Sequence, residues 1–354
     1  MAQQAATAPL PPASGPAPAD TLPLSTEQHP RTSRHCYGAL DLGTNNCRLL
    51  IARPAEDGFV VIDAFSRVVR LGEGLASSGR ISDAAQDRAI AALAICAEKL
   101  CRRRVTLSRS VATEACRRAA NGRHFVERVK SETGICLEVI SPEEEARLAM
   151  LGCHRLLEPG DGPALIFDIG GGSTELVLVD ADGSSTPRIV CWWSAPWGVV
   201  SLTESEGPAP QDAEARLAAF SRMKERVRHA FRRFAELLPA DKSGNIRLMG
   251  TSGTVTTLAS VHLALPSYDR RAVDGLMVPA SSMRAVSEML SRMDHQERAA
   301  LPCIGSERAD LVVAGCAILE AIMEIWPAKT LGIADRGIRE GILRSLMVRD
   351  GLVP

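Results

Sequence analysis

Residues 164–179 read ALIFDIGGGSTELVLV, an apolar run followed by a glycine-rich turn and a second apolar run. Apolar runs of this length on either side of a tight turn predict two adjacent β-strands. Asp168 lies near the end of the first run, and Gly170, Gly171 and Gly172 form the turn. Because glycine has no side chain, the backbone N–H groups of such a turn can approach an anion closely. The stretch therefore predicts a strand, a candidate anion-binding turn and a second strand.

The same pattern occurs earlier in the chain. Residues 39–50 read ALDLGTNNCRLL, and Asp41 lies 127 residues before Asp168, again with a hydrophobic residue and a glycine after it. A repeat at so long an offset indicates duplicated domains and not a solenoid. The length of 354 residues agrees with this interpretation, because single hydrophobic cores rarely grow beyond about 250 to 300 residues.

Strands and helices alternate after each copy of this pattern, which predicts an α/β fold with a mixed, largely parallel sheet in each domain. A cluster of turn residues, PGDGP at 159–163, separates the two copies. We expect domain I at 36–160 and domain II at 161–354, with the last helix as a candidate to pack on domain I. Residues 1–35, rich in Pro and Ala, are expected to form a disordered tail and not a signal peptide.

The composition limits the classes of partner. The formal net charge of -1 gives no general reason to expect binding to nucleic acid or to an anionic membrane. Charged residues interrupt every long apolar segment, so no run of about 18 apolar residues predicts a membrane span. The ten cysteines are scattered without a C-x-x-C pair, which is typical of reduced core thiols in a cytoplasmic protein.

Six motifs carry a resemblance to a known family. They are ALDLGTNNCRLL (39–50), VATEACRRAANG (111–122), SPEEEARLAMLG (141–152), FDIGGGSTELVL (167–178), GTSGTVTTLA (250–259) and GIADRGIREGIL (332–343). With the motifs in this order and spacing, the chain resembles the short, two-domain branch of the exopolyphosphatase and guanosine pentaphosphate phosphohydrolase family, in the actin and sugar-kinase superfamily. The resemblance implies two duplicated actin-like (ribonuclease H-like) domains, with mixed sheets flanked by helices and an active-site cleft between the domains.

The resemblance also implies an activity. A protein of this family is expected to hydrolyse the terminal phosphate of inorganic polyphosphate by water attack in a Mg²⁺-dependent site, and guanosine pentaphosphate is the alternative substrate. Other divalent cations and a monovalent cation are further cofactor candidates. The resemblance implies a homodimer, and we expect neither nucleic acid nor a membrane as partner.

Two turns are the main candidates to bind phosphate oxygens. One consists of Gly43, Thr44 and Asn45, and the other of Gly170, Gly171, Gly172, Ser173 and Thr174. Either turn alone is equally well an ordinary hairpin turn. Their occurrence at equivalent places favours ligand binding. A third and weaker candidate is the turn with Gly250 and Ser252, which opens a predicted helix.

The acidic segment SPEEEAR at 141–147 begins a predicted helix. Ser141 is the expected N-cap, Pro142 the first helical residue and Glu144 the partner of Ser141 in a capping box. Glu145 has no such structural role, and it shares a helix face with apolar residues one turn further on. The resemblance assigns the catalytic base to Glu145.

Three more carboxylates are candidates for the site. Glu175 begins the strand after the glycine-rich turn, and the resemblance implies that it orients water or binds metal. Asp41 and Asp168 lie near strand ends, where carboxylates can hold Mg²⁺ through waters. The structural alternatives are an acid facing water for Glu175 and turn capping for the two aspartates. For metal binding we rank Asp168 before Asp41 and include Glu175.

Arg117 is the basic candidate. The resemblance places it in the active-site cleft, where a guanidinium can grip phosphate oxygens with two parallel hydrogen bonds. Other arginines surround it in the sequence, and a run of arginines is more often a solvated helix face. We also expect the basic residues of the helix predicted at 210–238 to be solvated.

Two rival functions are left open by these residues. A kinase of the same superfamily would transfer the phosphate to a bound acceptor instead of water. A non-catalytic sensor would bind polyphosphate or the guanosine alarmone without turnover. The two candidate catalytic glutamates, Glu145 and Glu175, argue against the sensor.

Overall fold

The two predicted hairpins begin the two β-sheets of the fold. The structure is a computed structural model that describes residues 35–56, 58–157, 162–180, 187–208, 210–239 and 246–352. The expected tail, residues 1–35, lies outside the described residues except for its last residue. The first sheet has the strand order β3-β2-β1-β4-β5. Its strands are β1 (Tyr37–Leu42), β2 (Asn46–Ala55), β3 (Gly58–Val68), β4 (Leu107–Ala112) and β5 (Leu137–Val139).

The second sheet repeats this arrangement and adds one strand, with the order β10-β11-β9-β6-β7-β8. Its strands are β6 (Ala164–Ile169), β7 (Thr174–Asp180), β8 (Arg188–Ala195), β9 (Arg247–Thr251), β10 (Met277–Pro279) and β11 (Thr330–Ala334). The predicted α/β class, the mixed sheets and the duplication are confirmed. The sheets are not largely parallel, because the meanders β1-β2-β3 and β6-β7-β8 each contribute two antiparallel pairs.

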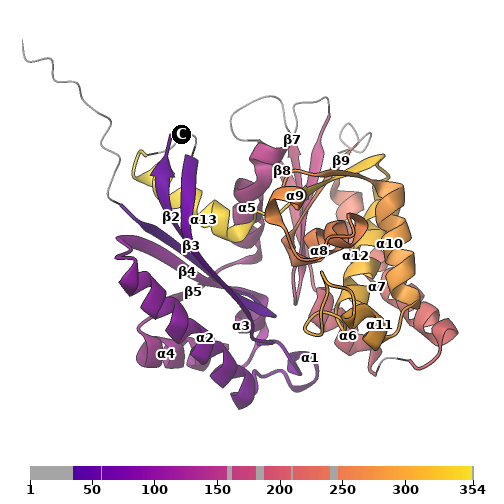
Figure 1. Cartoon of the computed structure of the whole chain (residues 1–354), viewed down its shortest axis with the longest axis horizontal. Helices are drawn as coiled ribbons and strands as arrows, with labels where there is room; N and C mark the ends of the chain where they lie inside the picture. Colours follow the sequence, from indigo (N-terminus) through magenta and orange to yellow (C-terminus); the bar gives the residue numbers. More distant parts are fainter. Residues whose placement is uncertain are drawn as a thin grey trace, which may run out of the picture. The chain divides into compact units, whose positions relative to one another are not determined.

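Helices cover the outer faces of both sheets. The first sheet packs on α2 (Asp83–Arg102) and α4 (Gly122–Thr133), with Leu40 and Leu93 in the shared core. Apolar residues of the second sheet pack on α7 (Ala213–Leu237), α8 (Ser252–His262), α10 (Ala280–Arg292) and α12 (Val312–Ile325). Figure 1 shows α2 and α4 on the flank of the first sheet and α7, α10 and α12 on the flank of the second.

Two further helices lie between the sheets. α5 (Pro142–Cys153) contributes Leu148 to the core on the inner face of the first sheet and Met150 to the core on the inner face of the second. α13 (Ile338–Arg349) packs Leu343 against the first sheet. Figure 1 shows both helices in the middle, between the strands of the two sheets. All of these elements belong to one compact unit, and the domain boundary near residue 160 stays a prediction.

Helix starts follow local signals in the sequence. Ser82 caps α2, and Ser141 caps α5 by accepting a hydrogen bond from the N–H of Glu144. Ser141 thus has its predicted role. The capping-box role of Glu144 is wrong, because its carboxylate accepts hydrogen bonds from Arg109 at 2.7 Å and from Arg147 at 2.7 Å instead.

Several short elements were not predicted. They are α1 (Leu75–Ser78), α3 (Glu114–Arg118), α6 (Val199–Glu206), α9 (Arg270–Val273) and β10. None is longer than eight residues, which is too short for hydrophobic periodicity to show. A further short helix, α11 (His295–Ala299), follows α10 directly, because Asp294 caps a new helix.

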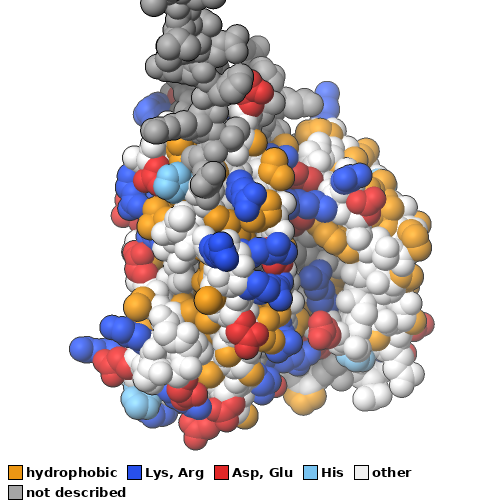
Figure 2. Space-filling model, turned by 60° about the vertical axis from the view of Figure 1, so that its left-hand side comes forward, with side chains coloured by type: hydrophobic (Ala, Val, Ile, Leu, Met, Phe, Trp, Pro, Cys, Tyr) orange, Lys and Arg blue, Asp and Glu red, His pale blue; other side chains and the backbone are white. Residues whose placement is uncertain are grey.

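The surface carries mixed charge. On the face in Figure 2, Lys and Arg side chains gather near the middle, with acidic and apolar side chains among them. Within the described ranges, no helix is both long enough and apolar enough to span a bilayer. The ten cysteines are free, and six of them are buried as expected, but Cys101 and Cys136 are exposed.

Candidate active site

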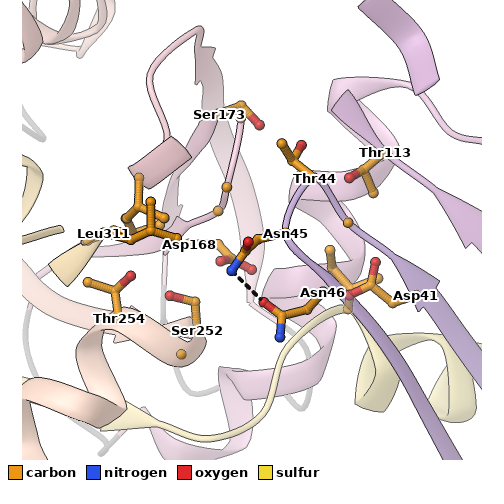
Figure 3. Close-up of a pocket in the computed structure, with 18 of the residues that line it drawn as sticks. Asp41, Thr44, Asn45, Asn46, Thr113, Asp168, Ser173, Ser252, Thr254 and Leu311 are labelled. Atoms are coloured by element: carbon orange, nitrogen blue, oxygen red, sulfur yellow. Dashed lines mark hydrogen bonds between the residues drawn. The ribbon is translucent and has the colours of Figure 1, made fainter. Parts of the chain in front are cut away.

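The two predicted phosphate-binding turns touch each other in one pocket. A Cβ on Gly171 would lie 2.9 Å from the Cβ of Thr44 and 3.1 Å from the backbone nitrogen of Asn45. A Cβ on Gly172 would lie 2.7 Å from the hydroxyl oxygen of Thr44. Only glycine leaves room for so close an approach of two backbones. Figure 3 shows Thr44, Asn45 and Ser173 around the shared space.

Hydrogen bonds behind the second turn orient its N–H groups. The carbonyl oxygens of Gly170 and Gly171 accept hydrogen bonds from backbone N–H groups at the start of α6, at 2.9 and 2.8 Å. The carbonyl of Gly172 accepts from the hydroxyl of Ser201 at 3.2 Å. In a planar trans peptide, the C=O and the next N–H point in opposite directions. The N–H groups of Gly171, Gly172 and Ser173 therefore point away from α6, and these three residues line the pocket.

The first turn is arranged in the same way. The carbonyl of Thr44 accepts a hydrogen bond from the N–H of Gly72, and that of Asn45 accepts from the N–H of Val69, both at 2.8 Å. The N–H groups of Asn45 and Asn46 consequently point away from this supporting segment. Each turn thus presents backbone N–H groups at the pocket, as in the backbone nests that bind anions.

The start of α8 contributes a third wall. Ser252, the first residue of α8, has a φ of 93°, which residues other than glycine seldom adopt. Its hydroxyl oxygen is buried and has no hydrogen-bond partner among the described residues. Figure 3 shows Ser252 and Thr254 beside the two turns. Backbone strain and an unsatisfied hydroxyl at the positive end of a helix point to a ligand contact.

Four carboxylates line the same pocket, those of Asp41, Glu145, Asp168 and Glu175. Glu145, in the first turn of α5, is 5% exposed. Burial, and next the charge of Glu175, raises the pKa of Glu145 well above its usual value. Arg117 opposes this shift, because its Nη1 donates a hydrogen bond to Glu145 Oε2 at 2.8 Å. A raised pKa makes a carboxylate a stronger proton acceptor, which is what a general base requires.

Glu175 and Asp168 lie opposite each other on the paired strands β6 and β7. Burial, with a further contribution from Asp168, raises the pKa of Glu175 to about 7. The hydroxyls of Ser173 and Ser194 donate hydrogen bonds to its Oε1, both at 2.8 Å. Burial likewise raises the pKa of Asp168 to about 6. Glu175 is 2% exposed, so it is not an acid that faces water.

Arg48 lines the pocket but was not among the residues predicted from the sequence. It pairs in register with Asp41, so its place in the first sheet corresponds to that of Glu175 in the second. Its Nη2 lies 3.0 Å from the position of a Cβ on Gly253, at the start of α8. A signal for it existed, because Arg48 lies 127 residues before Glu175, the same offset that relates the two aspartates.

Arg308 is a second cation that was not predicted. It lines the pocket, and its Nη1 donates a hydrogen bond to the hydroxyl of Thr257 at 2.6 Å. It lies in a segment that none of the six motifs covers, so nothing in the sequence marked it. Further polar residues of the lining are Asn46, Thr113, Thr254 and Thr257.

Arg117 lies behind Glu145 and is not part of the described lining of the pocket. Its guanidinium donates hydrogen bonds to Glu145, to the carbonyl of Ile140 and, from Nε and Nη2, to Glu114. These four bonds occupy four of the five N–H groups of an arginine. Arg117 therefore binds Glu145, the candidate base. The prediction that Arg117 binds phosphate oxygens through two parallel hydrogen bonds does not fit this position.

Two predicted phosphate contacts have other neighbours. Thr174 is fully buried, and its hydroxyl donates a hydrogen bond to the carbonyl of Trp197 at 2.7 Å. Gly250 packs against Phe167, whose ring would lie 2.7 Å from a Cβ at that position. The predicted contacts that do line the pocket are Gly43, Thr44, Asn45, Gly170, Gly171, Gly172, Ser173 and Ser252.

The fit of the carboxylates to a metal ion is partial. In the part of the chain that the structure describes, no three His, Cys, Asp or Glu side chains form a group that could hold a metal ion. Asp41 Oδ1 is buried and has no hydrogen-bond partner among the described residues. Besides burial, the nearby charge of Asp41 raises the pKa of Asp168, so the two carboxylates lie close enough to interact. Because Mg²⁺ usually keeps several waters and shares phosphate oxygens, one or two carboxylates suffice. Asp41 and Asp168 fit that requirement, whereas Glu175 already accepts two serine hydroxyls.

Curated relatives agree with these motifs. Residues 50–350 match the Ppx/GppA phosphatase family. Exopolyphosphatase 2 of Mycobacterium tuberculosis is 31% identical over 325 residues, which cover 87% of this chain and 97% of that protein. Exopolyphosphatase 1 of Mycobacterium leprae is 31% identical over 318 residues, which cover 87% of this chain and 89% of that protein.

Solved structures agree in fold. The crystal structure of an exopolyphosphatase-like protein matches with a TM-score of 0.79 at 29% identity and covers 89% of this chain and 99% of its own. A Ppx/GppA family member from Aquifex aeolicus matches with a TM-score of 0.72 at 29% identity, and the match covers 89% of this chain and 98% of that protein. The predicted fold class and the resemblance are confirmed. The chain belongs to the Ppx/GppA phosphatase family and is a hydrolase that acts on phosphoanhydride bonds.

Proposed function

We propose that this chain is an exopolyphosphatase, which releases the terminal phosphate of inorganic polyphosphate through attack by water. The observation that carries the proposal is the convergence of two N–H-presenting turns, the start of α8 and buried Glu145 in one pocket. Hydrolysis of a phosphoanhydride needs oriented donors for the phosphate oxygens and a group that orients the water. The two mycobacterial relatives, both named exopolyphosphatases, support the same substrate.

Each group in the pocket has a proposed role. Glu145 orients the attacking water and takes up its proton, and Glu175 assists. The pKa of Glu175, raised to about 7 by burial, lets it exchange a proton near neutral pH. The turn amides, with Arg48 and Arg308, hold the phosphate oxygens. General-base assistance supplies about 10²- to 10⁴-fold of rate, and electrostatic positioning supplies the remainder.

A Mg²⁺ ion is part of the proposal, with Asp41 and Asp168 as the residues that would hold it. When bound, the ion would neutralise negative charge on the phosphate oxygens. The support is the chemistry of the two aspartates. Both carboxylates line the pocket beside the turns and are half-buried, and the buried Asp41 Oδ1 atom has no hydrogen-bond partner among the described residues. Glu175 is the third and weakest candidate ligand.

The pocket favours polyphosphate over guanosine pentaphosphate. The described residues of its lining include no aromatic side chain, so guanine would find no ring on which to stack. A chain of phosphates needs only N–H donors and cations, which this pocket has.

The proposal extends to the assembly and the location of the protein. We expect a homodimer, on the basis of the family resemblance, and a cytoplasmic location, on the basis of the scattered cysteines without a C-x-x-C pair. No nucleic-acid or membrane partner is expected, in line with the net charge of -1. Sedimentation equilibrium of the purified protein would measure the oligomeric state.

The test is phosphate release from long-chain polyphosphate, guanosine pentaphosphate and ATP, each with Mg²⁺ and with EDTA. We expect the fastest release from polyphosphate, and we expect EDTA to abolish it. Faster release from guanosine pentaphosphate would make the alarmone the substrate. Binding of polyphosphate without release would support the sensor, and release that requires an added acceptor would support the kinase. Full activity in EDTA would overturn the role of Mg²⁺.

A further inference from the structure

The surroundings of Arg117 include a carboxylate that the proposed mechanism does not use. Glu114 is the first residue of α3, and its Oε2 accepts hydrogen bonds from Arg117 Nε at 3.2 Å and from Nη2 at 2.8 Å. The remaining nitrogen, Nη1, donates to Glu145 Oε2 at 2.8 Å and to the carbonyl of Ile140 at 2.8 Å. Glu114 and Glu145 therefore bind the same planar guanidinium through different edges.

These three charged side chains are shielded from water. The exposed fractions of their side chains are 14% for Glu114, 15% for Arg117 and 7% for Glu145. Hydrogen bonds between groups that are shielded from water are stronger than hydrogen bonds in water. Neighbouring bonds in one network also strengthen one another. A guanidinium is planar and rigid, so a bond along its Nε and Nη2 edge also fixes the direction in which Nη1 points.

Glu114 also contacts the glycine-rich turn. A Cβ on Gly172 would lie 3.0 Å from Glu114 Cγ and 3.3 Å from Glu114 Cβ. The aliphatic part of the side chain thus rests on Gly172 while its carboxylate holds Arg117. Through this one side chain, the phosphate-binding turn is in contact with the group that holds Glu145.

We propose that Glu114 is a positioning residue, which fixes Arg117 in the orientation that delivers an N–H group and a positive charge to Glu145. The inference rests on the proposed function, because Glu145 is the proposed base. The competing explanation is purely structural. In that case the pair between Glu114 and Arg117, three residues apart, would only stabilise the short helix α3.

Steady-state kinetics with polyphosphate separates the two explanations. In Glu114→Ala the orientation of Arg117 is lost, and we expect kcat to fall about tenfold while KM changes less than about twofold. Glu114→Gln keeps an oxygen acceptor and should stay within about threefold of the unmodified protein. Glu144→Gln is the matched control, because Glu144 precedes Glu145 on the same helix but pairs with Arg109, and its kcat should be unchanged.

A double-mutant cycle then tests whether Glu114 acts through Arg117. In an Arg117→Ala background, Glu114→Ala should cause almost no further loss of kcat, because its partner is already gone. An equal loss in both backgrounds would overturn the proposal. So would a loss of kcat in Glu114→Ala that Glu114→Gln does not relieve.

A spectroscopic measurement keeps this inference separate from the proposed function. In ¹⁵N-arginine-labelled protein, the side-chain signals of Arg117 can be assigned with Arg117→Lys. We expect restricted rotation of the guanidinium in the unmodified protein and in Glu114→Gln, and averaged signals in Glu114→Ala. Unchanged signals in Glu114→Ala would reject the positioning role. The expected signals in a protein that releases no phosphate would reject the proposed function alone.

Discussion

Glu175 has a carboxylate that the fold keeps away from water. Its pKa rises from 4.5 to about 7 because of burial and the nearby charge of Asp168. The folded state therefore retains a proton that the unfolded chain loses between these two values. The stability that comes from this proton is complete below about pH 4.5 and is lost as the pH rises through about 7.

This predicts a variant that is more stable than the unmodified protein above neutral pH. Glu175→Gln should match the unmodified protein in free energy of unfolding near pH 4 and exceed it at pH 8, by on the order of 1 to 3 kcal/mol. The amide keeps an oxygen for the hydroxyls of Ser173 and Ser194. Urea denaturation between pH 4 and pH 8 in EDTA measures the difference. A variant no more stable than the unmodified protein at pH 8 would show that ionised Glu175 is not destabilising.

Arg308 allows a test of phosphate binding separate from that of the chemical step. Because a hydrogen bond to a charged group contributes about 1.5 to 3 kcal/mol, Arg308→Ala should raise KM for polyphosphate at least about tenfold and lower kcat less. The control is Arg232→Ala with Arg233→Ala on α7, where both side chains are exposed. These should leave KM unchanged. An equal rise of KM in Arg308→Ala and in the doubly substituted control would mean that Arg308 acts only through the general surface charge.

Residues could be predicted from the sequence where a side chain lacked a structural role. Glu145 stood out because Ser141 and Pro142 accounted for the start of its helix, and the structure places it in the pocket. Glu114 and Arg308 carried no such signal. Glu114 lies in the same motif as Arg117, but the motif does not show that the two side chains pair. Arg308 lies outside all six motifs, and only the folded chain brings it to Thr257.

Among the elements, α5 and α13 cross with their backbones in contact. A Cβ on Gly152 would lie 2.0 Å from the carbonyl oxygen of Gly337, and one on Gly341 would lie 2.0 Å from the carbonyl oxygen of Leu148. Only glycine permits this approach. The crossing holds α5 between the two sheets, and α5 carries Glu145 at its other end.

Gly341→Ala should therefore destabilise the protein. We expect a loss of about 1 to 3 kcal/mol in free energy of unfolding, because the backbones must separate. The matched control is Ser345→Ala on the same helix, where the hydroxyl is buried without a partner among the described residues and its removal should be nearly neutral. Thermal or urea denaturation of both variants measures the difference. Equal stability of the two would contradict the close crossing.

Long elements could be predicted because their apolar pattern extends over many residues. The hairpins around Asp41 and Asp168 and the capped helices α5 and α7 are examples. Short elements such as α3 and α6 were not predicted, because a helix of fewer than three turns is too short to show a hydrophobic period in the sequence. The sheets proved mixed and not largely parallel, because each contains three strands joined in sequence by short turns, and such strands run antiparallel.

Over the whole molecule, the duplication places unlike side chains at equivalent positions. Arg48 faces Asp41 in the first sheet, and Glu175 faces Asp168 in the second. In the proposed mechanism, one copy contributes a cation for phosphate, and the other contributes an acid for the reaction. The offset of 127 residues predicts which positions correspond. It does not predict that the two turns touch, because that contact depends on how α5 and α13 pack between the sheets.

The measurement that bears most directly on the central claim is phosphate release from polyphosphate by Glu145→Gln, beside Glu144→Gln and the unmodified protein. Both variants remove one carboxylate from the same helix turn, but only Glu145 lines the pocket. We predict that Glu145→Gln lowers kcat by at least about 100-fold while Glu144→Gln keeps the unmodified rate. A Glu145→Gln protein that folds and retains the rate of Glu144→Gln would contradict this account of the site.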